Sequence, residues 1–128
     1  MAKAETIREA VKESYSSLAR TADQSCCDSA KTDKLIHYGY SPGELQSLPE
    51  SVIAMADGCG NPTALGTIRE GDVVLDLGSG GGVDVFLASR KVGRNGRVIG
   101  LDMTPEMVNR ARENAVNLDV TNVEFKLG

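Results

Sequence analysis

A glycine-rich turn framed by two acidic residues is the part of the sequence best suited to chemistry. Gly78, Gly80 and Gly82 alternate after a short apolar run. Asp76 stands two residues before the first of them, which gives the pattern D-x-G-x-G-x-G. Glycines let the backbone approach a ligand closely, and the start of a following helix offers free N–H groups. Asp102 follows Gly82 by twenty residues, where a carboxylate can accept both hydroxyls of a ribose.

The spacing of the glycines restricts the kind of nucleotide that the turn could hold. The dinucleotide fingerprint G-x-G-x-x-G would need its third glycine where Val83 stands, so a nicotinamide or flavin cofactor fits poorly. Taken alone, the glycines could simply form a turn and the acids could simply end two strands. The combination of turn and acids favours a ligand site.

Three cysteines are the second candidate for chemistry. Cys26 and Cys27 are adjacent, which is the wrong spacing for a C-x-x-C zinc site. His37 does not complete a set of zinc ligands with the usual spacing. Cys59 lies between two glycines that leave its thiol sterically open. Thiolates prefer soft, thiophilic partners to oxygen or nitrogen compounds. The alternative is that Cys59 is a small buried hydrophobe and the adjacent pair an incidental part of the surface.

The first half of the chain is predicted to be helical with irregular connections. An i, i+3, i+4 pattern indicates an amphipathic helix over residues 7–19, and residues 21–32 show no period and are predicted to form a mobile loop. Ser41, followed by proline and by Glu44, predicts a capped short helix. Asn61 followed by proline predicts a further helical turn.

The second half alternates between strand and helix patterns. Strands are predicted at 73–77, 98–102 and 123–127, and helices at 83–92 and 105–118. This order predicts an α/β fold with a Rossmann-like, incomplete sheet of about three strands behind an N-terminal helical cap. We divide the chain into a cap segment, residues 1–71, and the first half of a nucleoside-binding domain, residues 72–128. The first strand would lie at a sheet edge although it is apolar on both faces, so we expect self-association there.

Charge and hydropathy exclude two classes of partner. Lys and Arg number 14 against 18 Asp and Glu, so the net charge is −4, which argues against nucleic acid. No apolar run approaches the about 18 residues that span a bilayer, and the charged N-terminus is unlike a signal peptide. The chain is therefore expected to be cytoplasmic, with a small molecule as its substrate.

The turn and its acids together resemble the first motif and the following acidic motif of class I S-adenosylmethionine-dependent methyltransferases. The resemblance covers roughly residues 72–127 and implies S-adenosylmethionine as cofactor. It implies that the loop at Gly78, Ser79 and Gly80 contacts the amino-acid end of the cofactor and that Asp102 holds the ribose. Met103 stands where the family places an apolar side chain against the adenine, although a core methionine would look the same.

Residues of the cap narrow the resemblance to one family of these methyltransferases. With Tyr15, the adjacent cysteines and Gly-Cys-Gly-Asn-Pro at residues 58–62, the chain is similar to the N-terminal part of arsenite methyltransferases. That resemblance implies that trivalent arsenic is bound by thiolates, with Cys59 as one of them and arsenic held as substrate. It implies that Cys26 or Cys27 takes part in thiol-disulfide exchange and that a thiol reductant is a partner. Tyr15 would lean over the methionine end of the cofactor or anchor its helix to the core.

The sequence also departs from that family. A further arsenic-binding cysteine after the fourth strand and a C-terminal domain are absent from these 128 residues, so this chain alone is expected to be inactive or nearly so. One alternative is another small-molecule methyltransferase of the same fold, for which the thiols would be accidental. Another is a fragment without catalytic activity that binds nucleosides or dimerises through its sheet edge.

Overall fold

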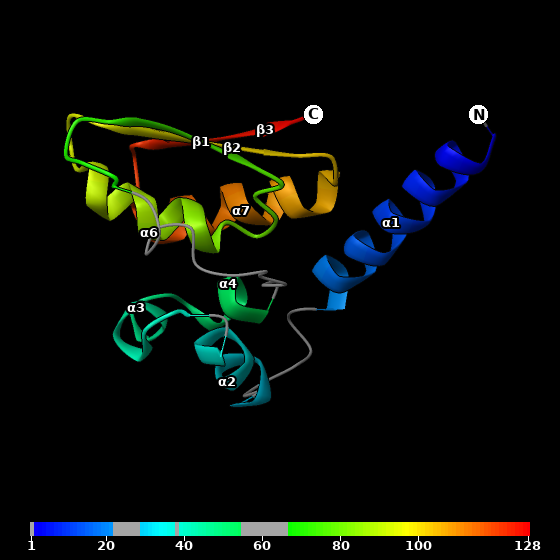
Figure 1. Ribbon diagram of the computed structural model, residues 1–128, viewed down its shortest axis with the longest axis horizontal. Coiled ribbons are helices and arrows are strands. Elements are labelled where there is room, and N and C mark those ends of the chain that lie inside the picture. Colours follow the sequence, from blue (N-terminus) through cyan, green and yellow to red (C-terminus); the bar gives the residue numbers. More distant parts are fainter. Residues whose placement is uncertain (1, 22–28, 38, 55–66) are drawn as a thin grey trace.

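The computed structural model describes residues 2–21, 29–37, 39–54 and 67–128, in which the only sheet has three parallel strands (Figure 1). These strands are β1 (Val73–Leu77), β2 (Arg97–Asp102) and β3 (Val123–Leu127), in the order β1-β2-β3. The helices α6 (Val83–Val92) and α7 (Pro105–Asn117) connect them. The predicted β-α-β-α-β order is confirmed.

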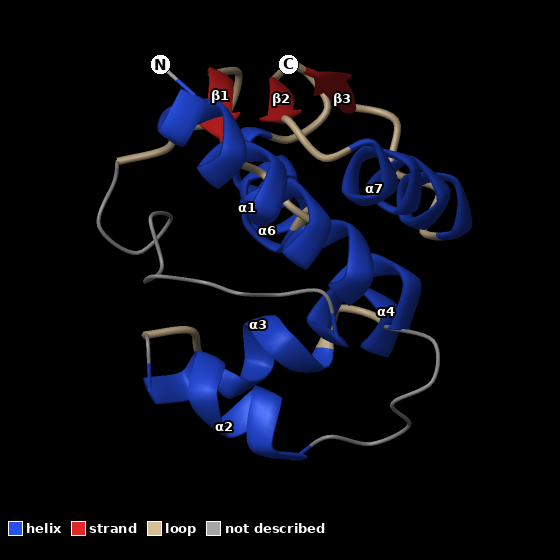
Figure 2. Cartoon of the chain, turned by 90° about the vertical axis from the view of Figure 1, so that its right-hand side faces the viewer, coloured by secondary structure: helices blue, strands red, loops and turns tan. Residues whose placement is uncertain are grey.

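Both connecting helices cover the same face of the sheet (Figure 2). Parallel strands joined by right-handed crossovers that step in one direction require this placement. The buried side chains between the layers include Phe86 of α6 and Phe125 of β3, whose ring centroids lie 5.7 Å apart. Ala111 and Val108 of α7 complete the contact and are almost fully buried. The packing of this core determines how α6 lies against β1 and β2.

The described part of the N-terminal half contains four helices: α1 (Ala2–Thr21), α2 (Ser29–His37), α3 (Pro42–Gln46) and α4 (Glu50–Ala54). The last three lie beneath α6 and α7, on the side away from the sheet (Figure 1). The Ser51 hydroxyl of α4 donates to Asn114 Oδ1 of α7 at 2.8 Å. The Ser16 hydroxyl of α1 donates to Glu106 Oε2 of α7 at 2.7 Å. Helix α7 is therefore the main support of the helical half.

The helix predictions for this half were confirmed only in part. The capping box of α3 is present, since Ser41 Oγ accepts from the Glu44 N–H and Glu44 Oε2 accepts from the Ser41 N–H. The loop predicted over 21–32 was wrong for Thr21, which ends α1, and for residues 29–32, which belong to α2. Burial of Leu35 against the core stabilises that helix, and tertiary packing of this kind leaves no local period. The turn predicted at Asn61 lies outside the described residues.

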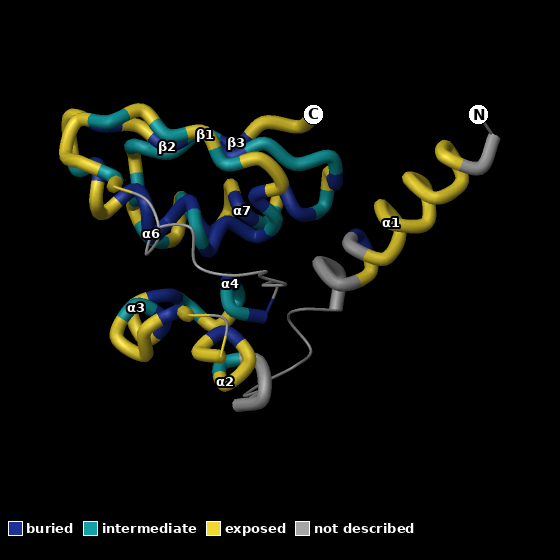
Figure 3. The backbone as a smooth tube through the Cα atoms, viewed as in Figure 1, coloured by how far each residue is buried: buried dark blue, intermediate teal, exposed yellow. Residues whose placement is uncertain are grey.

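The outer face of the sheet is apolar along β1. Val73, Leu75 and Leu77 point away from the helices and are 72%, 59% and 70% exposed. Figure 3 shows β1 as exposed or half-buried along its length. Strand β1 therefore lies at an edge with the composition of a central strand, as the sequence predicted.

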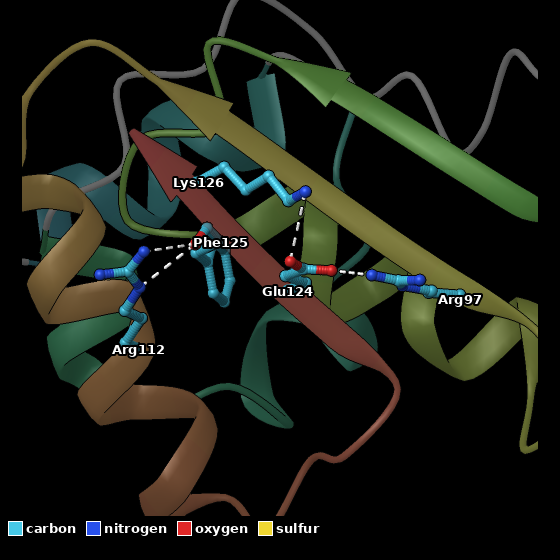
Figure 4. A network of polar contacts seen from close by, with 5 residues as sticks. All are labelled: Arg97, Arg112, Glu124, Phe125 and Lys126. Atoms are coloured by element: carbon cyan, nitrogen blue, oxygen red, sulfur yellow. Dashed lines mark hydrogen bonds and ion pairs between the residues drawn. The ribbon is translucent and has the colours of Figure 1, made fainter. Parts of the chain in front are cut away.

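The opposite edge is polar and partly closed. The Arg112 side chain of α7 donates twice to the backbone oxygen of Phe125, at 2.8 and 3.2 Å (Figure 4). Glu124 forms ion pairs with Arg97 and, at 3.4 Å, with Lys126. Charged side chains and an occupied backbone carbonyl both discourage pairing with another strand. The two edges of the sheet are thus unequal, and β1 is the one open to contacts.

We expect the isolated chain to self-associate through β1, and Leu75→Lys to weaken that association. A lysine there places a charge in the middle of the exposed apolar strand. Light scattering across a concentration series measures the effect. Val116→Lys is the matched control, because Val116 is 79% exposed but lies on α7. Equal association of wild type and Leu75→Lys would show that β1 is not the contact.

Candidate functional site

Residues 78–82 connect the carboxyl end of β1 to α6 and form an open turn. The N–H groups of Gly78 and Ser79 donate to the Leu101 carbonyl at 2.7 and 3.0 Å, which ties the turn to β2. Gly78 and Gly80 have positive φ values of 74° and 53°, and a Cβ atom on either would meet nothing within 4 Å. A Cβ on Gly82 would instead lie 2.9 Å from the Phe86 ring. The first two glycines therefore border free space, whereas Gly82 is required by packing.

Asp102, the acid predicted to follow the turn, lies beside it at the end of β2. Its Oδ2 accepts from the Gly80 N–H at 2.9 Å, and its Oδ1 accepts from the Thr104 N–H at 2.9 Å. A carboxylate oxygen has two lone-pair sites, so each oxygen can still accept a ligand hydroxyl. The backbone bonds hold the carboxylate in a fixed orientation for that purpose.

Two polar atoms at the turn are buried without a hydrogen-bond partner among the described residues: Asp76 Oδ2 and Ser79 Oγ. Burial of the carboxyl, followed by the charges of Asp84 and Asp102, raises the pKa of Asp76 from 3.8 to about 6. Buried polar atoms are usually paired, so these two atoms are candidates for contact with a ligand. That Asp76 and Ser79 belong to the site stays a prediction.

Sequence analysis missed a second acid and its partner. The buried Tyr40 hydroxyl donates to Asp84 Oδ1, in the first turn of α6, at 2.7 Å. Burial raises the pKa of Asp84, the hydrogen bond from Tyr40 opposes this, and the charge of Glu44 adds to it. An acid in the first turn of a helix is common because it interacts favourably with the helix dipole, so its type and position gave no distinctive signal.

The remaining predicted site residues are Met103, Tyr15 and the three cysteines. Met103 follows Asp102 and is half-buried. Tyr15 lies in α1, and only its backbone is described. Cys26, Cys27 and Cys59 fall outside the described residues. Within the described ranges, no group of three His, Cys, Asp or Glu side chains could hold a metal ion, and no helix is long and apolar enough to cross a membrane.

The raised pKa of Asp76 predicts a stability effect. The folded chain binds this proton more tightly than the unfolded chain, so the carboxyl favours folding below pH 3.8 and opposes it as the pH rises through about 6. Asp76→Asn, which stays neutral, should raise the free energy of unfolding at pH 8 by about 1 kcal/mol, after allowing for solvent screening of a partly exposed group. The gain should vanish at pH 4.

Urea denaturation at both pH values measures this difference. Asp33→Asn, on the exposed side of α2, is the control for removing a carboxylate elsewhere. Loss of stability at pH 8 in Asp76→Asn would contradict the prediction. If this prediction is confirmed, the ionised Asp76 carboxylate lowers the free energy of unfolding. Such destabilisation is expected of a residue that serves in binding.

Comparison with known proteins places this geometry in a family. Residues 68–128 match the family model described as "Methyltransferase domain". An arsenite methyltransferase of Halobacterium salinarum is 43% identical over 97% of this chain and 35% of its own length. A protein-L-isoaspartate O-methyltransferase of Archaeoglobus fulgidus is 34% identical over 77% of this chain and 41% of its own length.

Solved structures show the same similarity. An arsenic(III) S-adenosylmethionine methyltransferase from Chlamydomonas reinhardtii has a TM-score of 0.60 and 36% identity, over 67% of this chain and 30% of that chain. An S-adenosylmethionine-dependent methyltransferase from Aquifex aeolicus has a TM-score of 0.50 and 33% identity, over 80% of this chain and 48% of that chain. The chain thus spans less than half the length of these relatives.

Proposed function

Because this chain belongs to the class I S-adenosylmethionine-dependent methyltransferases, we propose that it is the cofactor-binding part of an enzyme that methylates trivalent arsenic. The observation that carries the proposal is the 43% identity to an arsenite methyltransferase over 97% of the chain. That match covers the cap as well as the glycine turn, whereas the family model begins only at residue 68. The turn would bind the cofactor in any methyltransferase of this class. Similarity in the cap is therefore the part of the match that favours arsenic as the methyl acceptor.

The residues present fit S-adenosylmethionine. The open space at Gly78 and Gly80 admits the amino-acid end of the cofactor, and the buried unpaired atoms of Asp76 and Ser79 are suited to its polar groups. Asp102, fixed by two backbone N–H groups, would accept the ribose hydroxyls. We assign two further roles: Met103 packs against the adenine, and Tyr15 of α1 covers the methionine end.

Methyl transfer to arsenic would depend on aligning the arsenic with the methyl group more than on moving a proton. S-adenosylmethionine supplies a methyl group on a positively charged sulfur. Its transfer to trivalent arsenic would form an As–C bond from the arsenic lone pair as the S–C bond breaks, so no strong general base would be needed. Arsenic is thereby oxidised from the trivalent to the pentavalent state, and a thiol reductant would return two electrons to it. Thiolates of Cys59 and of Cys26 or Cys27 would hold the arsenic in line with the methyl group.

A second candidate function is methyl transfer to an acceptor other than arsenic, such as a peptide carboxyl group. The similarity to the protein-L-isoaspartate O-methyltransferase also includes part of the cap, at 34% identity over 77% of the chain. Residues 72–128 would bind the cofactor identically in both cases, since the glycine turn and Asp102 are independent of the acceptor. Within this chain, the two candidates therefore differ in residues 1–71.

The test is a methyl-transfer assay of the whole enzyme, purified in its native form, with isotope-labelled S-adenosylmethionine and two acceptors. Trivalent arsenic with glutathione is the first acceptor and an isoaspartyl peptide is the second. Label in methylated arsenic alone would support the proposal, and label in the peptide alone would replace it. Cofactor binding without label in either product would favour a binding fragment without catalytic activity.

A further inference from the structure

The hydrogen bond between Tyr40 and Asp84 connects the helical cap to the cofactor turn. Tyr40 lies between α2 and α3 and is only 2% exposed, and its hydroxyl reaches Asp84 Oδ1 across 44 positions of sequence. Asp84 stands two residues after Gly82, the N-cap of α6. The bond therefore spans from the cap to the first helical turn after the glycine-rich segment.

The bond also affects the charge of that turn. A hydroxyl that donates to a carboxylate stabilises the ionised form, and this opposes the effect of burial on Asp84. The charge of Asp84 in turn raises the pKa of Asp76, so the two carboxyls are close enough to interact. Asp76 has a buried oxygen without a partner among the described residues. Two acidic groups thus flank the open turn, and one of them is held by the cap.

We propose that Tyr40 is a positioning residue that holds the Asp84 carboxylate at the amino-acid end of the cofactor site, where this carboxylate attracts the cofactor's ammonium group. The inference rests on the proposed function, because it assumes that the turn binds S-adenosylmethionine. The free N–H groups at the start of α6 suit the cofactor's carboxylate. Asp84 and Asp76 supply the opposite charge for its ammonium group. Docking of the α2–α3 segment and recognition of the amino-acid end would then be coupled.

Two conservative variants separate the hydrogen bond from the charge. Tyr40→Phe removes the hydroxyl and keeps the buried ring, whereas Asp84→Asn removes the charge and keeps an acceptor oxygen for Tyr40. Ser51→Ala is the control, since Ser51 also joins the cap to the body of the domain, but through Asn114 of α7. Correct folding of each variant is checked by its NMR spectrum.

The readout compares two ligands by NMR titration. S-adenosylhomocysteine carries the amino-acid end, and 5′-methylthioadenosine has the same nucleoside without it. We expect Asp84→Asn to weaken S-adenosylhomocysteine binding about 10-fold and Tyr40→Phe about threefold, with methylthioadenosine affinity changed less than about twofold. Ser51→Ala should leave the ratio of the two affinities unchanged.

Each other outcome has a defined meaning. If Tyr40→Phe and Asp84→Asn weaken both ligands equally, or neither ligand, the pair is merely structural and the inference is wrong. If only Asp84→Asn changes the ratio, Asp84 acts without positioning by Tyr40, which also overturns the inference. If the wild type binds neither ligand, the proposed function fails instead.

Discussion

In the whole enzyme proposed above, Cys59→Ser is expected to lower the rate of arsenic methylation about 100-fold, equivalent to about 2.7 kcal/mol of transition-state stabilisation. A thiolate is a soft ligand that bonds trivalent arsenic well, and a serine hydroxyl of nearly the same size is a hard one. In the sequence Cys59 stands between Gly58 and Gly60, and glycine has no side chain that would crowd a bound metalloid. The variant should therefore lose arsenic binding without a steric penalty. The measurement is kcat/KM with arsenite and glutathione.

The cofactor site provides the control for this experiment. Cys59→Ser should bind S-adenosylhomocysteine as tightly as the wild type, because the residues assigned to the cofactor lie at the turn and at Asp102. Counting free thiols during arsenite titration shows whether one thiol fewer is consumed. Unchanged turnover in Cys59→Ser would rule out its role as an arsenic ligand and leave the general methyltransferase as the better interpretation.

The adjacent cysteines can be assigned by the same assay. The resemblance to arsenite methyltransferases requires one N-terminal thiol, and this chain has Cys26 and Cys27 side by side. Single serine variants distinguish them: the variant that loses turnover identifies the residue that exchanges with the arsenic site. If neither loses turnover but the double variant does, the two thiols are interchangeable.

The second half of the fold could be predicted because local signals there agree with the tertiary structure. The strand at 73–77, the turn and the helix 83–92 each carry their own pattern, and all three were found where they were expected. In the cap the local signals are weaker. Helix α4 has only five residues and depends on burial of Val52 and Ala54, which no short-range pattern indicates.

For some residues, the residue type indicates where the residue lies but not which hydrogen bonds it forms. Thr104 occupies the N-cap of α7, a position that its residue type favours, but its side chain makes no capping bond. Asp102 was expected at the end of β2 and lies there, yet its bonds to Gly80 and Thr104 could not be read from spacing. The Tyr40–Asp84 contact joins residues 44 positions apart, and only the packing of the cap on α6 brings them together.

Asp102→Ala is expected to weaken S-adenosylhomocysteine binding at least about 10-fold, since a hydrogen bond to a charged group contributes about 1.5–3 kcal/mol. Two effects act in the same direction. The variant removes the acceptor proposed for the ribose hydroxyls, and it releases the Gly80 N–H that the carboxylate holds at 2.9 Å. Asp102→Asn keeps an acceptor oxygen and should lose less affinity. Calorimetry on the purified variants measures the difference.

The control must separate binding from stability, because Asp102 also supports the backbone. Asp72 is suited to this, since its Oδ2 accepts from the Arg69 N–H at 2.8 Å at the opposite end of β1. Asp72→Ala should lower the free energy of unfolding and leave ligand affinity unchanged. Equal affinity in wild type and Asp102→Ala would remove this residue from the site. Equal losses of affinity in Asp72→Ala and Asp102→Ala would show that both carboxylates act only through the stability of the sheet.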